Sequence, residues 1–337
     1  MEKTKKQKSG KVVKVICIVL AVIVVLFGSF TIVSHAVYRR SDMATAVELL
    51  FRIQGSKKAF SDPQKVADFI EKRAEAEDYV FDASRLKSNV SEEQVNDSLV
   101  YTLTSSDAPE YLVIYLHGGA YINDATVYHL KLCDRLAQEL NAKVIFPIYP
   151  LTPKHTWDET YELLTDVYGN VVEDTELPII VMGHSAGGGM AVAFCEYLDT
   201  INLPQPDRLI LFSPWMDISM ANPEAADYES VDPMLSAYGL VEMGKCWAGD
   251  LALTDYRLSP IYGDVSMLRN VTLFVGTREI FYPDVTAFYQ ILQAQGIESE
   301  LFIGEGMNHV YTVYPIPEAD TAFDQISTAI RCGVAEQ

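Results

Sequence analysis

The stretch of sequence that decides the fold runs from Ile179 to Gly188 and reads IIVMGHSAGG. Its first four residues form an apolar run of the kind found in buried strands, and the residues after Ser185 are compatible with the start of a helix. The Gly-x-Ser-x-Gly string at 183–187 therefore has the strand–turn–helix context of a nucleophile elbow. Gly183 and Gly187 leave room for strand and helix to approach at the sharp turn. The stretch predicts that Ser185 is a nucleophile at the top of a sheet.

A serine nucleophile needs a base, and His309 is the candidate. A hydroxyl attacks only when a base takes its proton, and an acid orients that base. After a nucleophile elbow, the order along the chain is serine, acid, histidine. Of the 6 histidines in the chain, only His309 follows Ser185, and it lies in a loop after the last expected strand.

Two carboxylates are candidates for the acid that orients His309. Glu279 and Asp284 both follow the expected strand Leu273–Val275, where the acid is found after an elbow. Glu279 lies in the loop itself. Asp284 follows Pro283 and belongs to the first turn of a helix, where an acidic side chain favours the helix dipole for structural reasons. We therefore prefer Glu279 and keep Asp284 as the alternative acid.

A glycine pair predicts the donors for the developing oxyanion. An apolar run at 111–116 is followed by His117, Gly118 and Gly119. Glycines after a strand let backbone N–H groups point at an acyl oxygen without an intruding side chain, and each such donor contributes about 3–4 kcal/mol to catalysis. The N–H groups of Gly118, Gly119 and Ala186 are the expected oxyanion hole.

Outward from the elbow, short apolar runs alternate with helical patterns, which predicts an α/β fold with a mostly parallel sheet and helices on both faces. The expected strands are Leu112–Leu116, Val144–Ile148, Ile179–Met182, Leu209–Phe212, Leu273–Val275 and Leu301–Ile303, with one or two more within 89–104 for a sheet of eight strands. The expected helices are Tyr128–Leu140, Thr156–Val172, Gly187–Asp199, Asp284–Gln295 and Glu318–Ile330, preceded by amphipathic helices at Ser41–Gly55 and Ser61–Asp78. The segment Pro214–Asp264 is longer than one crossover requires, so we expect it to be a lid or cap.

Taken in order, these motifs resemble those of the hormone-sensitive-lipase-like esterases of the α/β-hydrolase fold (the alpha/beta hydrolase fold-3 family). The matching motifs are His117-Gly118-Gly119, Tyr149-Pro150-Leu151-Thr152-Pro153, Gly183-His184-Ser185-Ala186-Gly187-Gly188 and the late His309. The resemblance covers about residues 80–332. It implies hydrolysis of carboxylic esters without a cofactor or metal, and a helical cap formed by the N-terminal helices together with the insertion at 214–264.

The chain departs from that family at three positions. Ala120 stands where a third glycine is frequent, and His184 stands where many members have Asp beside the nucleophile. Glu279 stands where Asp is commoner, and Asp284 matches an acid that often follows. The longer glutamate arm can still orient the histidine.

The N-terminus differs from the rest of the chain in charge and hydropathy. Residues 1–40 carry eight basic side chains and one acidic one, a charge of +7. Because the net charge of the whole chain is −20, residues 41–337 carry −27. Between the basic flanks, Val15–Val33 has 19 residues without a charge, and a helix of that length spans roughly 30 Å of hydrocarbon. Because six lysines precede the span, we expect a cytoplasmic N-terminus and a catalytic domain outside the cell membrane. The alternative is a cleaved signal peptide and secretion, with cleavage near Ala36.

These observations predict four regions: a basic cytoplasmic tail (1–14), a transmembrane helix or uncleaved signal anchor (15–34), a helical lead that contributes to the cap (41–80), and an α/β-hydrolase domain (81–337) with the cap insertion at 214–264.

The net charge of −20 argues against a nucleic-acid partner, and the 5 scattered cysteines argue against a disulfide scaffold or a zinc module. The expected partners are a small-molecule ester, with a short- to medium-chain or acetyl acyl group, and the membrane. No pattern in the chain specifies an oligomeric state.

Three functions are compatible with the elbow. The first is a serine esterase that acts through Ser185, His309 and Glu279. The second is an amidase or peptidase on the same residues, and the third is a non-catalytic binding protein that keeps the fold. The esterase is preferred because every residue type that the reaction needs is present, and no segment resembles the additional domains that peptidases of this fold often carry.

Overall fold

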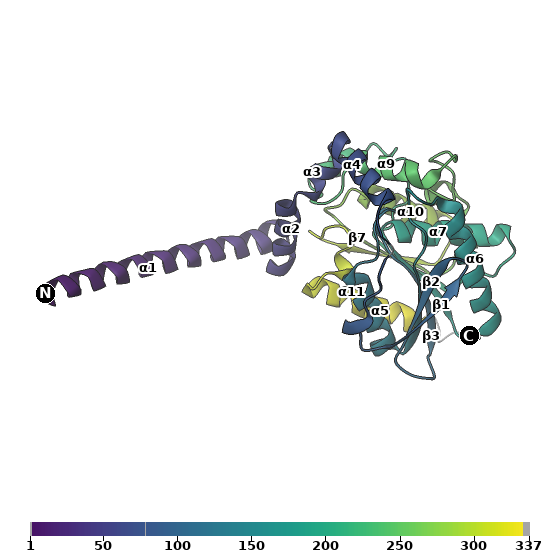
Figure 1. Cartoon of the computed structure of the whole chain (residues 1–337), viewed down its shortest axis with the longest axis horizontal. Coiled ribbons are helices and arrows are strands. Elements are labelled where there is room, and N and C mark those ends of the chain that lie inside the picture. Colours follow the sequence, from purple (N-terminus) through teal and green to yellow (C-terminus); the bar gives the residue numbers. More distant parts are fainter. Residues whose placement is uncertain (1, 78, 333–337) are drawn as a thin grey trace.

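The computed structural model describes residues 2–77 and 79–332, and its centre is an eight-stranded sheet (Figure 1). The strand order is β1-β2-β4-β3-β5-β6-β7-β8. The β1–β2 and β2–β4 pairs are antiparallel, and the remaining neighbours are parallel. The strands are β1 (Asn89–Val95), β2 (Ser98–Thr104), β3 (Tyr111–Leu116), β4 (Ala142–Pro147), β5 (Ile179–His184), β6 (Arg208–Phe212), β7 (Val271–Gly276) and β8 (Ser299–Gly304). The mostly parallel α/β architecture predicted from the alternating pattern is confirmed, and each expected strand is present.

Helices cover both faces of the sheet because its central strands are apolar on both sides. All residues of β3 are buried, and successive side chains point to opposite faces. Leu112 and Ile114 therefore join one core cluster, whereas Val113 and Tyr115 join the other. The first cluster includes side chains of α6 (Trp157–Asp174), α7 (Ala186–Thr200) and α10 (Tyr282–Ala294). The second includes side chains of α5 (Val127–Leu140) and α11 (Pro317–Cys332).

The helical lead contains three helices, where the sequence predicted two. They are α2 (Asp42–Gln54), α3 (Ser56–Phe60) and α4 (Pro63–Ala74). Gly55, in a left-handed conformation, ends α2 and allows the chain to start the short α3. Asp62 caps α4 by accepting hydrogen bonds from two backbone N–H groups. The helix ends at Ala74, earlier than expected, and the predicted end at Asp78 lies outside the described residues.

The insertion at 214–264 is packed against this lead. It carries α8 (Ala225–Glu229), α9 (Ala237–Ala248) and the 3-10 turn η3 (Pro260–Tyr262). Helices α3 and α4 both contact α9, and the contact is close at Gly239, where a Cβ atom would lie 2.7 Å from the carbonyl oxygen of Phe60. The remaining short turns are η2 (Ala83–Arg85), η4 (Val265–Met267) and η5 (Tyr311–Val313).

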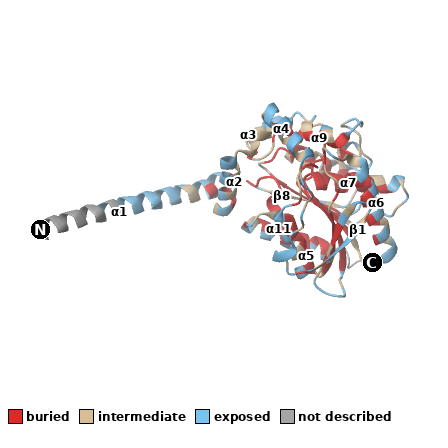
Figure 2. Ribbon diagram, in the orientation of Figure 1, coloured by how far each residue is buried: buried red, intermediate tan, exposed pale blue. Residues whose placement is uncertain are grey.

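A single long helix precedes the domain. Helix α1 (Glu2–Ile32) continues into a π-helical turn, η1 (Val33–Val37), so the basic tail and the expected span form one helix. The candidate span Ile16–Val37 has a mean hydropathy of 3.0, and its side chains are largely exposed except that of Ser34 near its end. Figure 2 shows this helix extending away from the domain with its described residues largely exposed. By length and composition it is able to cross a membrane.

Candidate active site

Ser185 occupies the sharp turn between β5 and α7. Its backbone has φ 53° and ψ −119°, a conformation that is strained for a residue with a side chain. The turn depends on glycine at both flanking positions. A Cβ atom at Gly183 would lie 2.2 Å from the carbonyl oxygen of Gly187, and one at Gly187 would lie 2.3 Å from the carbonyl oxygen of Leu116. The strand–turn–helix context predicted from the sequence is therefore present, and it places Ser185 at the carboxyl end of β5, in the wall of a cavity.

Two loops bring a histidine and a glutamate to this serine. The Nε2 atom of His309 lies 2.9 Å from Ser185 Oγ, and its Nδ1 atom lies 2.5 Å from Glu279 Oε2. His309 comes from the loop after β8, and Glu279 comes from the loop after β7. With the Nδ1–H group donating to the carboxylate, Nε2 is left as the acceptor for the serine proton. The arrangement can deprotonate the hydroxyl.

Ser213 is a further member of this network, and the sequence analysis assigned it no role. Its hydroxyl donates to Glu279 Oε1 at 2.7 Å and accepts a hydrogen bond from the backbone N–H of Val310 at 3.1 Å. The N–H of Gly276 also donates to Glu279 Oε1, at 2.5 Å. Ser213 thus connects the end of β6 to both the acid loop and the histidine loop. The available signal was a polar residue directly after an apolar strand, which is common in loops.

Asp284, the alternative acid, lies elsewhere. It occupies the first turn of α10, as the sequence suggested, and its Oδ1 atom accepts a hydrogen bond from Asn222 Nδ2 at 2.7 Å. Burial raises the pKa of the Asp284 carboxyl to about 6. Of the two candidate carboxylates, that of Glu279 therefore contacts His309, whereas that of Asp284 is hydrogen-bonded to Asn222 of the insertion.

The glycine pair after β3 lies beside the serine. A Cβ atom at Gly118 would lie 2.8 Å from the carbonyl oxygen of His184 and 3.1 Å from Ser185 Cβ, and Gly119 has φ 138°, with Asn123 O only 2.4 Å from a Cβ atom built there. Both positions therefore require glycine. Ala186 is the first residue of α7, where backbone N–H groups have no partner within the helix. The three expected oxyanion donors come from backbone that surrounds Ser185.

These residues open into a cavity of about 540 Å³. Its wall contains Gly118, Gly119, Ser185 and His309, and the rest is mainly apolar. The lead and the insertion both contribute large apolar side chains to the wall, namely Phe51, Phe60, Met234, Leu235, Leu240 and Met243. The cavity has the size and the lining of a pocket for a small apolar ligand.

Three buried histidines lie beneath the site. His184 Nδ1 is 2.5 Å from the hydroxyl of Tyr115, its Nε2 is 3.2 Å from Thr312 Oγ1, and its ring stacks on Phe212. Burial lowers the pKa of His184, lowers that of His117 to about 4, and lowers that of His129 to about 3. All three are therefore neutral near pH 7. The histidine that replaces the family's aspartate is a buried hydrogen-bonding group rather than a charge.

No group of three or more histidine, cysteine, aspartate or glutamate side chains suited to a metal ion occurs in the part of the chain that the structure describes.

The chain is similar to proteins that cleave esters. A family model described as alpha/beta hydrolase fold matches residues 113–313, a segment that contains every predicted site residue. An esterase of Acinetobacter venetianus is 28% identical over 221 residues, which cover 64% of this chain and 73% of that protein. A solved structure from Staphylococcus aureus, described as a candidate esterase, has 30% identity and a TM-score of 0.76, and the match covers 80% of this chain and 93% of that one. A solved esterase of the bacterial hormone-sensitive lipase family has the same fold, with a TM-score of 0.70, 22% identity, and coverage of 81% of this chain and 98% of its own.

Proposed function

The chain belongs to the alpha/beta hydrolase fold family and is an esterase of that family, and we propose that Ser185, His309 and Glu279 carry out its reaction. The observation that carries the proposal is the pair of contacts on His309, at 2.9 Å to Ser185 Oγ and 2.5 Å to Glu279 Oε2. An imidazole in this position can accept a proton from one side while a buried carboxylate stabilises the resulting cation from the other.

In the proposed reaction, Ser185 Oγ attacks the acyl carbon while His309 Nε2 takes the hydroxyl proton. The N–H groups of Gly118, Gly119 and Ala186 donate to the oxyanion of the tetrahedral intermediate. His309 then gives its proton to the departing alkoxide, which leaves an acyl–serine ester and a free alcohol. A water molecule then reacts in the same way. His309 takes a proton from the water, and the resulting hydroxide adds to the acyl carbon. The carboxylic acid leaves, and Ser185 Oγ regains the proton from His309.

The lining of the cavity supports a short- to medium-chain acyl group. A space of about 540 Å³ between the lead and the insertion is closed mainly by apolar side chains, which can bury a hydrocarbon chain but offer few partners for a charged one. Helices α2–α4 and the insertion at 214–264 together form the cap in this proposal, since side chains from both line the same space.

The test is the hydrolysis of p-nitrophenyl esters from acetate to decanoate by the full-length chain in detergent. Wild type should turn over these esters, and Ser185→Ala should lose at least about a thousandfold in kcat. A fluorophosphonate probe should label wild type at Ser185. Equal, slow hydrolysis by both proteins would contradict the proposal, and absence of labelling would favour the non-catalytic binding protein. Faster cleavage of acyl anilides than of the matching esters would favour the amidase.

We further propose that α1 remains as a single membrane span, with the N-terminus in the cytoplasm and the catalytic domain outside. The junction between the span and the domain supports retention, because Ser34 near the end of the span and Arg40 just after it are both buried. The motif expected for signal cleavage, Ser34-His35-Ala36, lies within the π-helical turn η1 that continues α1. The mass of the mature chain and protease protection in intact cells test this. A mature N-terminus at Val37 would support secretion instead.

A further inference from the structure

Helix α2 leaves four large apolar side chains exposed, whereas Val47 and Phe51 are half-buried against the domain. Its buried side carries Ala44, Thr45 and Glu48, of which two are polar. The opposite side carries an apolar row, here called the outer stripe, which consists of Met43, Ala46, Leu49, Leu50 and Ile53. Met43, Leu49, Leu50 and Ile53 are 52%, 50%, 56% and 71% exposed. A surface helix in water has the reverse arrangement, with its apolar side against the core. The outer stripe is therefore suited to a non-aqueous surrounding.

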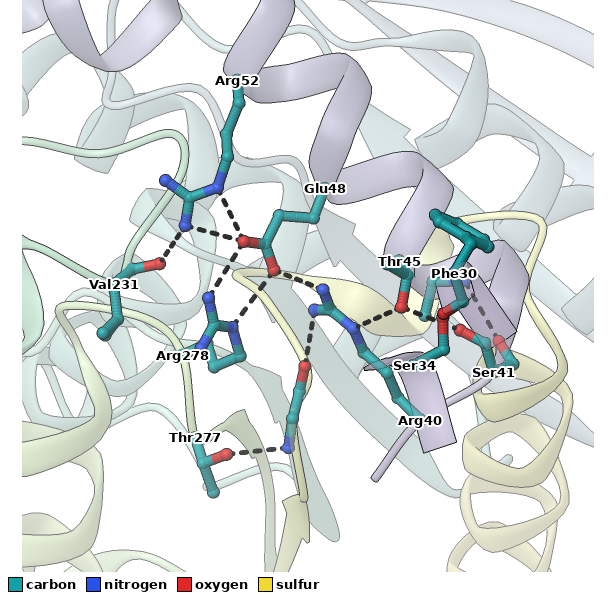
Figure 3. Close-up of polar contacts among 12 residues, drawn as sticks. Phe30, Ser34, Arg40, Ser41, Thr45, Glu48, Arg52, Val231, Thr277 and Arg278 are labelled. Carbon is teal, nitrogen blue, oxygen red and sulfur yellow. Dashed lines mark hydrogen bonds and ion pairs between the residues drawn. The ribbon is translucent and has the colours of Figure 1, made fainter. Parts of the chain in front are cut away.

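The buried side of α2 is held by an ionic network, so the helix cannot turn its stripe inward. Figure 3 shows Glu48 surrounded by three guanidinium groups. Its carboxylate lies 2.6 Å from Arg40 and 2.9 Å from Arg278. Arg40 also donates to the carbonyl oxygen of Gly306 at 2.8 Å, on the loop that leads to His309. These contacts fix the rotation of α2 relative to the catalytic loops.

The outer stripe lies where the membrane span meets the domain. The apolar window of the span ends at Val37, and α2 begins at Asp42. Thr31 near the end of α1 donates a hydrogen bond to Asp42 at 2.9 Å. Figure 1 shows α1 leaving the domain beside α2, which runs across the base of the long helix. If α1 crosses a bilayer, the outer stripe lies at the surface of the same bilayer.

The stripe is continuous with the wall of the catalytic cavity. Met43 lines a surface groove of about 450 Å³ together with Tyr128, Val313 and Tyr314, and these three residues also line the cavity that contains Ser185. The ring of Tyr314 lies 5.7 Å from that of Tyr128 and 5.3 Å from that of Phe51 on α2. Tyr128 is 37% exposed. A path thus runs from Met43, near the base of α1, to the site of the serine, with apolar and aromatic side chains on one wall and Lys131, Arg135 and Asp320 also in the groove.

We propose that the outer stripe of α2 inserts into the bilayer that α1 spans, and that the substrate is a bilayer-resident acyl ester that enters along this path. The proposal rests on the esterase function proposed above and specifies its substrate class. Apolar side chains at the level of the head groups and acyl chains bind a lipid surface by the area that they bury. A lipid ester would then reach Ser185 without passing through water.

The first test measures depth and does not depend on activity. Full-length Phe27→Trp (α1), Leu50→Trp (outer stripe) and Met267→Trp are reconstituted into phosphatidylcholine vesicles that contain lipids brominated in the acyl chains. Met267 is an exposed control, on a turn beside α7. Relative to wild type, we expect the bromolipids to quench the fluorescence of the tryptophans added at positions 27 and 50, but not that of the tryptophan added at 267. Quenching at 27 alone would overturn the proposal and leave the anchor intact, which is also the result if a second copy of the chain covers the stripe. If none of the three added tryptophans is quenched, both the membrane span and the inserted outer stripe are contradicted.

The second test measures the substrate class. The triple variant Leu49→Gln, Leu50→Gln, Ile53→Gln keeps good helix formers on α2. In vesicles that contain didecanoylglycerol, it should release decanoate at least about tenfold more slowly than wild type, with hydrolysis of soluble p-nitrophenyl butyrate within about twofold. Met267→Gln should leave both rates unchanged. Equal rates of decanoate release, or a wild type that cleaves only the soluble ester, would overturn the proposal while the esterase function stands. A wild type that cleaves neither ester would contradict the esterase function itself.

Discussion

Glu48 on α2 accepts hydrogen bonds from the guanidinium group of Arg278, at 3.1 and 2.9 Å, across a separation of 230 residues in the chain. Arg278 directly precedes Glu279, so this contact joins the first helix after the span to the loop that holds His309 in place. Burial alone would raise the pKa of Glu48, but the hydrogen bond from Arg278 and the charges of Arg40 and Arg278 outweigh burial and lower the pKa. The carboxylate is charged and fully engaged near pH 7.

The first prediction concerns this buried carboxylate. Glu48→Ala leaves Arg40 and Arg278 without their shared partner, and a buried charge without a partner costs about 3–5 kcal/mol. We expect a loss of that size in the free energy of unfolding, measured by thermal or chemical denaturation. Arg52→Ala is the matched control, because the Arg52 side chain is 42% exposed where that of Arg40 is 1% exposed. It should cost less than about 1 kcal/mol. Equal losses in the two variants would contradict the prediction.

The second prediction compares the two candidate acids in one assay. Glu279→Gln removes the carboxylate that lies 2.5 Å from His309, and kcat should fall by about 10³–10⁴. Asp284→Asn keeps a hydrogen-bonding group beside Asn222 and should change kcat by less than about tenfold. The comparison uses kcat for p-nitrophenyl butyrate. A larger loss in Asp284→Asn would transfer the role to Asp284.

The third prediction tests the backbone contact at the elbow. Gly187→Ala places a Cβ atom 2.3 Å from a carbonyl oxygen of β3, and overpacking of this kind destabilises a protein by about 1–3 kcal/mol. We also expect a large loss in kcat, since Ser185 would move with its turn. Gly169→Ala in α6 is the control, because nothing lies within 4 Å of its added Cβ atom. That change should stabilise the protein by about 0.5–1 kcal/mol. Loss of stability in both variants would point to a general intolerance of alanine rather than to the elbow.

The fourth prediction is a dependence of stability on pH. Burial lowers the pKa of His129 from 6.5 to about 3, so the unfolded chain binds a proton there in a range where the native protein does not. Stability should therefore fall as the pH is lowered from about 6.5 towards 3, with roughly 2 kcal/mol from His129 at pH 5. His129→Gln removes the titration and keeps an acceptor for the N–H of Thr126 at the start of α5. Between pH 7 and pH 5, the melting temperature of the variant should fall by less than that of wild type. Equal losses would exclude His129 as a source of the dependence.

Much of the site could be predicted because each part has a local signal. The elbow at 183–187, the glycine pair at 118 and 119, and a single histidine after the nucleophile are visible in the chain itself. Ser213 had only an unspecific signal, a polar residue after an apolar strand, since its role arises only where the ends of β6, β7 and β8 lie side by side and bring Val310 and Glu279 to one hydroxyl. The network of Arg40, Glu48 and Arg278 was missed for the same reason.

By itself, the sequence determined what depends on neighbouring residues. Apolar runs and helical periods specify a strand or a helix locally, so the alternation of elements, the long apolar helix and the strand–turn–helix context of Ser185 could all be predicted. Only the tertiary structure decided which carboxylate lies against His309, because Glu279 and Asp284 are five residues apart and differ in the loop geometry around them. It also decided which side of α2 is buried. A helical period shows two different faces but not which one meets the protein, and here the ionic partners of Glu48 turn the apolar face outward.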